Sequence, residues 1–167
     1  MRTLIVAGLL ALPVSAMAGD RTEYGGSGYW KVVGVESNGM KSCAIATDYP
    51  NVGTFGLDVY TYPNGQRDTG ISWSDFQKVT AATMSIRFDN KFFGGIDPKP
   101  WENLLTVHIS NTDLMATFEL MHQYQIQGKM AQLNVGSKTY KVNFTGFVES
   151  LEFLGTCFKA IGMQPAQ

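Results

Sequence analysis

Residues 54–62 have the sequence Thr-Phe-Gly-Leu-Asp-Val-Tyr-Thr-Tyr, and Pro63-Asn64-Gly65 follows directly. Side chains of different character alternate through this stretch, with Leu57, Val59 and Thr61 on one side and Asp58, Tyr60 and Tyr62 on the other. A two-residue period is typical of a half-buried strand, and a Pro-Asn-Gly run favours a tight turn. Residues 68–73 then form a second β-prone run. The region therefore predicts an antiparallel β-hairpin.

Similar alternation on both sides of this hairpin predicts a chain built mainly of strands. We expect further strands over residues 29–35, 41–47, 82–89, 103–110, 129–135 and 139–144. The connection between the first two contains Asn38-Gly39, a pair that favours the positive φ angles of a tight hairpin. Because short turns of this kind join antiparallel neighbours, we expect antiparallel sheets.

The apolar period changes towards the C-terminus. Residues 111–128 begin with Asn-Thr-Asp, which provides a helix cap and an acidic first turn, and they end at a glycine. A second stripe at helical spacing lies between residues 145 and 161, and it consists of Phe147, Leu151, Leu154, Phe158 and Ile161. The predicted fold class is thus mainly β, an antiparallel β-sandwich or open barrel with two helices near the C-terminus.

The first residues predict an exported protein. A short positive start leads into an apolar run from Leu4, and Ala16-Met17-Ala18 then provides the Ala-x-Ala site of a secretory signal peptide. The apolar run is shorter than the roughly 20 residues that a membrane-spanning helix needs. We therefore predict a signal peptide over residues 1–18, a flexible Gly-rich arm over 19–28, a single β-rich domain over 29–167, and no membrane span.

The chain has two cysteines, Cys43 and Cys157, which lie far apart in the sequence. In an oxidising compartment thiols persist mostly as disulfides, so we predict one intramolecular bridge between them. The bridge would join the second predicted strand to the last predicted helix. A free buried thiol and an intermolecular bridge are the alternatives, whereas the spacing excludes CxxC redox chemistry.

Charge and motif content narrow the function classes. The chain has 13 Lys and Arg residues against 14 Asp and Glu residues, without a strong basic cluster, so we expect no nucleic-acid binding. Neither His108 nor His122 is followed by a second metal ligand at i+2, i+3 or i+4, and no nucleophile elbow or phosphate-binding glycine motif occurs. We therefore expect no catalytic residue, no metal and no cofactor. Convergence of acidic residues into a glycosidase-like pair is the alternative, with Asp58, Asp75, Asp97 and Glu102 as candidates.

Residues 90–102, Asn-Lys-Phe-Phe-Gly-Gly-Ile-Asp-Pro-Lys-Pro-Trp-Glu, form an unusual predicted loop. Loops often carry binding residues, and this one combines glycines and prolines with large apolar side chains. Its candidate binding residues are the rings of Phe92, Phe93 and Trp101, with Lys91 and Lys99 at the rim. The alternative, which we favour, is that the loop folds back and its rings complete the core.

The C-terminal third resembles a known family. The segments that carry the resemblance are Asp113-Leu-Met, residues 128–135, and residues 138–157 with their Gly146-Phe147 pair, and an early Trp30 precedes the first cysteine. A helix, a β-hairpin and a Gly-Phe-x-x-small-Leu helix that ends near a cysteine resemble small exported proteobacterial proteins of the invasion-associated locus B family. The resemblance covers residues 112–160 well and 28–45 loosely. It implies a periplasmic or secreted β-sandwich without catalytic residues.

Together these features predict an exported cell-envelope or secreted protein that binds another protein and catalyses no reaction. One alternative is a periplasmic inhibitor or immunity protein for an envelope-acting enzyme. A second is a carrier that holds a small apolar ligand inside a β-barrel. A third is a hydrolase with a dispersed site that includes His108.

Overall fold

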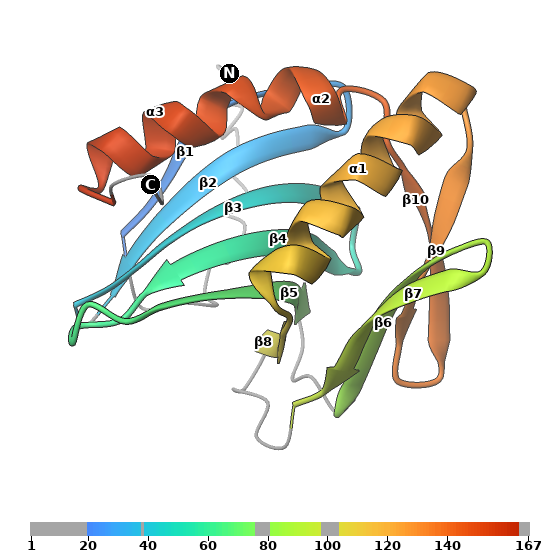
Figure 1. The fold of residues 1–167 in the computed structure, drawn as a ribbon, viewed down its shortest axis with the longest axis horizontal. Helices are drawn as coiled ribbons and strands as arrows, with labels where there is room; N and C mark the ends of the chain where they lie inside the picture. The colour runs from blue at the N-terminus through green and yellow to red at the C-terminus, as the bar shows by residue number, and fades with distance from the viewer. Residues whose placement is uncertain (1–19, 38, 76–80, 98–103, 164–167) are drawn as a thin grey trace, which may run out of the picture.

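The computed structural model describes residues 20–37, 39–75, 81–97 and 104–163, so the predicted signal peptide over residues 1–18 lies outside the described part. Within the described residues, two antiparallel sheets form the body of the molecule (Figure 1). The larger sheet has the order β1-β2-β3-β4-β5-β8. Its strands are β1 (Asp20–Ser27), β2 (Trp30–Ser37), β3 (Met40–Tyr49), β4 (Gly53–Thr61), β5 (Arg67–Asp75) and β8 (Leu104–His108).

The smaller sheet has the order β10-β9-β6-β7. Its strands are β6 (Thr83–Phe88), β7 (Lys91–Ile96), β9 (Met130–Val135) and β10 (Lys138–Asn143). The helices are α1 (Asn111–Gln127), α2 (Phe147–Ser150) and α3 (Glu152–Ala160). The fold prediction is therefore confirmed: the chain is mainly β, with antiparallel sheets and helices towards the C-terminus.

Aromatic rings join the two sheets. Phe144, which directly follows β10, stacks on Trp30 of β2 at a centroid distance of 6.1 Å and on Phe88 of β6 at 5.9 Å. All three side chains are buried, and Trp30 Nε1 donates to the Asn143 carbonyl oxygen at 2.8 Å. The strand periodicity read from the sequence thus reflects side chains that pack between the layers.

Residues 19–28, expected as a flexible arm, instead contribute strand β1, which pairs with β2. The glycines in this segment permit close packing. A Cβ at Gly25 would lie 2.6 Å from the ring of Phe153 on α3, and a Cβ at Gly26 would lie 2.3 Å from the Trp30 carbonyl oxygen. Glycine favours loops in a sequence, but here it lets the strand approach its neighbours closely.

The helices begin and end close to where the sequence predicts. Ser110 caps α1, since its Oγ accepts from the Asp113 N–H at 3.1 Å, and Gly128 ends the helix with a φ of 63°. The C-terminal helix is divided into α2 and α3 at Leu151, and the two pieces lie along β1 and β2 (Figure 1). Among the described residues, no helix has the length and apolar character needed to cross a membrane.

A disulfide between Cys43 on β3 and Cys157 on α3 confirms the predicted pairing. Both cysteines are fully buried, and their Cα atoms lie 6.1 Å apart. Gly34 on β2 lies opposite Cys43, and a Cβ at Gly34 would come within 3.1 Å of the Cys157 Sγ. The absence of a side chain at residue 34 therefore leaves room for the bridge to pass over β2 from β3 to α3.

The Gly-Phe-x-x-small-Leu pattern is a packing motif. The hydroxyl of Ser150 accepts from the Ser27 N–H at 2.8 Å and lies within hydrogen-bonding distance of the carbonyl oxygens of Gly146 and Trp30, at 2.7 and 3.1 Å. A Cβ at Gly146 would lie 2.0 Å from the Ser27 carbonyl oxygen. The turn between β1 and β2 is thus fixed against the start of α2.

We expect Ser150→Ala to lower the free energy of unfolding by about 1–3 kcal/mol, because it leaves the partly buried Ser27 N–H without its acceptor, the hydroxyl of the fully buried Ser150. Urea denaturation of the purified protein measures the change. Thr156→Ala, at an exposed position on α3, is the matched control and should change stability by less than about 0.5 kcal/mol. Equal stabilities for the two variants would contradict this account of the motif.

Candidate functional site

The β6–β7 hairpin carries the described part of the predicted binding segment. Residues 91–96, expected as part of a loop, form strand β7 and pair with β6. The Gly94-Gly95 pair suggested a loop, but Gly94 is required by the strand itself: its φ is 156°, and a Cβ there would lie 2.2 Å from the Met84 carbonyl oxygen. Lys99 and Trp101 lie outside the described residues.

Phe92 and Phe93 point to opposite faces of β7. Phe93 is half-buried, and its ring centroid lies 6.3 Å from that of Phe88 in the core. Phe92 is 72% exposed. The alternative reading, in which the rings of this segment complete the core, therefore applies to Phe93 and not to Phe92.

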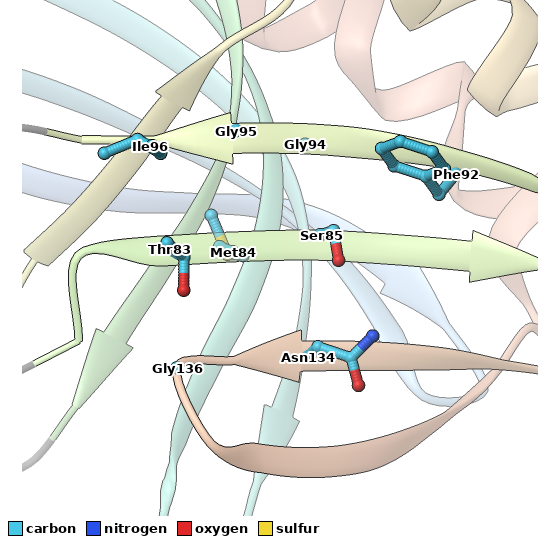
Figure 2. Close-up of a pocket in the computed structure, with 9 residues that line it drawn as sticks. All are labelled: Thr83, Met84, Ser85, Phe92, Gly94, Gly95, Ile96, Asn134 and Gly136. Atoms are coloured by element: carbon cyan, nitrogen blue, oxygen red, sulfur yellow. The ribbon is translucent and has the colours of Figure 1, made fainter.

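A hollow of about 290 Å³ lies on the outer face of the small sheet beside Phe92 (Figure 2). Phe92 and Ile96, which is 69% exposed, stand at the two ends of the hollow, and Gly94 between them contributes no side chain. Ser85 and Asn134 provide polar groups from the neighbouring strands, and the lining is completed by Thr83, Met84, Gly95 and Gly136. The volume is at the lower end of the roughly 300–1,000 Å³ typical of small-molecule pockets.

The small sheet is positively charged. Its four strands contain Arg87, Lys91, Lys138 and Lys141 and no Asp or Glu. The register places Phe92, Arg87, Gln132 and Lys141 in one row across the outer face. By contrast, the strands of the large sheet contain Asp20, Glu23, Glu36, Asp48, Asp58, Asp68 and Asp75. A chain with almost balanced charge therefore has one basic sheet.

A second polar cluster lies on the face of the large sheet that is turned away from the disulfide. Asp58 on β4 is buried and accepts a hydrogen bond from the Ser72 hydroxyl on β5. Tyr60 hydrogen-bonds to Asp58 and to Thr106, and its ring covers Gly70, where a Cβ would lie 3.4 Å from Tyr60 Cε2. The sequence did not single out this cluster, because a polar residue that alternates with apolar ones suggests an exposed strand face.

Burial raises the pKa of the Asp58 carboxyl from 3.8 to about 6, although the hydrogen bonds from Ser72 and Tyr60 lower it. Burial and the nearby Asp58 charge also raise the pKa of the Tyr60 phenol. A carboxyl with such a pKa can hold a proton near neutral pH, which is a property of many functional sites and of some purely structural ones. Among the hydrogen bonds of the described residues, none joins Ser72 to a histidine that could activate its hydroxyl as a nucleophile.

The histidine and acidic residues that the sequence offers as catalytic candidates do not come together among the described residues. His108 Nδ1 lies 2.9 Å from Asp68 Oδ2, in a partly exposed pair. Asp75 lies opposite Gly53, whereas Asp58 lies opposite Gly70, so these two carboxyls are five positions apart along β5 and on opposite faces. Asp97 Oδ2 accepts from the Thr106 N–H at 3.1 Å, and Glu102 lies outside the described residues. Among the described residues, no group of three or more His, Cys, Asp or Glu side chains could hold a metal ion.

The fold and the exposed surface thus define a disulfide-bridged protein of two antiparallel sheets, with an apolar hollow on the basic one. Comparison with known proteins adds no relative: no family model, no curated protein and no solved structure matches the chain.

Proposed function

We propose that this chain is an exported protein of the cell envelope, or a secreted one, that binds another protein through β7 and catalyses no reaction. The observation that carries the proposal is Phe92, a large ring that is 72% exposed on a strand at the edge of a sheet. Exposed aromatic residues beside a hollow are typical anchors of protein interfaces.

Two further features support this function. The Cys43–Cys157 bridge is compatible with an oxidising compartment, as the predicted signal peptide requires. The resemblance of the C-terminal third to the invasion-associated locus B family points to the same location. An inhibitor or immunity protein for an envelope enzyme would be one member of this class of binding protein.

The alternative of a small-ligand carrier has less support. The hollow beside Phe92 opens on the outer face of the small sheet, while rings of Trp30, Phe88 and Phe144 pack in the space between the sheets. A carrier needs an interior cavity instead. The surface hollow therefore favours contact with a side chain of a partner.

Phe92→Ala should reduce capture of the partner at least tenfold in a pull-down from envelope extract of the source cells, since truncating an interface anchor commonly costs more than about 1.4 kcal/mol of binding. Ile126→Ala is the matched control, because Ile126 on α1 is 73% exposed and lies outside the β7 surface. Both variants should keep wild-type unfolding curves. Unchanged capture by a folded Phe92→Ala protein would refute the proposed surface.

A further inference from the structure

Among the described residues, no strand pairs with the edge of β7 that faces away from β6. β7 is the last strand of the small sheet and pairs with β6 alone among the described strands. The Asp97 N–H donates to the Ala82 carbonyl oxygen at 2.9 Å, so the backbone groups of residue 97 face β6. Backbone groups along a strand face its two neighbours alternately. In this alternation Phe93 and Gly95 direct their backbone groups towards β6, so Phe92, Gly94 and Ile96 direct theirs outwards.

The same residues that present the outward backbone groups also frame the hollow. A strand added to β7 would place every second side chain on the outer face, beside Phe92, Gly94 and Ile96. The side chain opposite Gly94 would then lie over the hollow between the two apolar residues. Backbone pairing would supply affinity, and this position would supply side-chain selectivity.

Charge indicates what kind of strand fits. Lys91 lies on β7, on the face opposite the hollow, and the four strands of this sheet contain no acidic residue. Asp89 and Asp97 flank β7, but Asp89 Oδ2 lies 3.7 Å from Lys129 Nζ and Asp97 Oδ2 accepts from the Thr106 N–H. Acidic side chains that alternate with apolar ones on the added strand would lie on the same face as Lys91, whereas basic ones there would be repelled. Complementary charge therefore selects an acidic partner segment.

We propose that β7 binds an extended, acidic peptide segment of the partner protein by strand addition, with one apolar side chain of that segment seated over Gly94. This inference rests on the proposed function, because it specifies how the same surface takes its partner. It is a claim about backbone pairing at an edge, which the exposure of Phe92 alone does not require.

The probe is a fluorescein-labelled seven-residue peptide that alternates Val with Glu, and its matched control has Lys in place of Glu. Fluorescence anisotropy with the full mature protein should give at least tenfold tighter binding of the Glu peptide. Lys91→Glu should reverse the preference, because the Glu side chains of the peptide lie on the same face as Lys91, and this exposed substitution should leave the fold intact. Equal affinity for the two peptides, or no binding of the Glu peptide, would overturn the acidic class of partner.

Backbone pairing is tested separately from side-chain contact. Two N-methylated forms of the Glu peptide carry the methyl groups on the Val amides or on the Glu amides, so each form blocks one edge of the strand. Strand addition predicts that one form loses affinity at least tenfold and the other keeps it. Equal effects of the two methylations would overturn strand addition.

Amide hydrogen exchange by NMR gives an independent test with its own control. Peptide binding should slow exchange at Phe92, Gly94 and Ile96 at least tenfold, while Phe93 and Gly95 should change little because they already pair with β6. Slower exchange at the same amides on raising the protein concentration without peptide would instead show pairing between two copies, and would overturn the proposal. If Phe92→Ala abolishes partner capture but these tests fail, the binding function stands and strand addition falls.

Discussion

Reduction of the Cys43–Cys157 bridge is expected to lower the free energy of unfolding by about 4 kcal/mol. The two cysteines are 114 positions apart, and closing a loop of that length removes roughly 4–5 kcal/mol of chain entropy from the unfolded state in the usual model. The bridge also attaches α3 to the large sheet, where α3 covers β1, β2 and β3. Loss of the bridge should therefore loosen α3 first.

Guanidinium denaturation with and without reductant measures the effect on the wild-type protein. The matched control is the double variant Cys43→Ala/Cys157→Ala, whose stability should not depend on reductant. Hydrogen exchange should show the largest gain in α3, at residues such as Phe158. A change of less than about 1 kcal/mol on reduction, in a protein with no titratable thiol before reduction, would contradict this account.

The sequence predicts the regular strands and the helices well, because the apolar face of each packs into the core. In β4 the alternation around Leu57 and Val59 follows the side chains that point into the core. In α1 the helix ends at Gly128 as predicted, whereas its cap is Ser110, one residue before the Asn-Thr-Asp run that was expected to provide it. Local patterns of this kind do not depend on distant contacts, and so they can be read from the chain alone.

Strands β1 and β7 are missed for a common reason. Both contain adjacent glycines, and glycine is frequent in loops as well as in tightly packed strands. At Gly25 the deciding contact is Phe153, more than a hundred positions away, and at Gly94 it is the backbone of β6. A local pattern contains neither contact, so the sequence could not distinguish a close approach from flexibility.

The candidate site is predictable in part. The sequence identifies the segment that contains Phe92, but only the register of β7 shows that Phe92 and Phe93 face opposite ways. It names Asp58 among four candidate acids but misses its burial, which depends on two small neighbours, Gly56 on the same strand and Gly70 on β5. A Cβ at Gly56 would lie 3.4 Å from Asp58 Oδ2, and Gly70 gives room for the Tyr60 ring.

Asp58→Asn is expected to stabilise the protein at pH 7 by about 2 kcal/mol and to have little effect below pH 4. Burial raises the pKa of the Asp58 carboxyl from 3.8 to about 6 in the folded protein. The folded state therefore binds a proton more tightly than the unfolded state. Between pH 4 and pH 6 the contribution of this group to stability falls as the pH rises, and the full cost, about 3 kcal/mol at roughly 1.4 kcal/mol per pKa unit, is present above that window.

An amide at residue 58 carries no charge and so avoids this cost. It keeps one accepting oxygen, and the Ser72 hydroxyl can rotate to accept from the new NH₂ group, so most of the hydrogen bonding survives. Imperfect geometry reduces the gain from about 3 to about 2 kcal/mol. Urea denaturation of the variant and the wild type at pH 3.5, 5 and 7 gives the difference at each pH, and carbon NMR titration of the Asp58 carboxyl gives its pKa directly.

Asp48→Asn is the matched control of opposite sign. Burial raises the pKa of Asp48, but hydrogen bonds from Lys31 and Thr54 together lower it by more, so the net shift of the pKa is downward. Asp48 therefore stabilises the fold at neutral pH, and this contribution is lost as the pH falls through its lowered pKa. Its amide variant should be less stable than the wild type at pH 7.

A destabilised Asp58→Asn protein at pH 7, or an Asp58 carboxyl that titrates near pH 4, would show that the polar face of β4 is open to water, and that the Tyr60 ring does not shield the carboxyl.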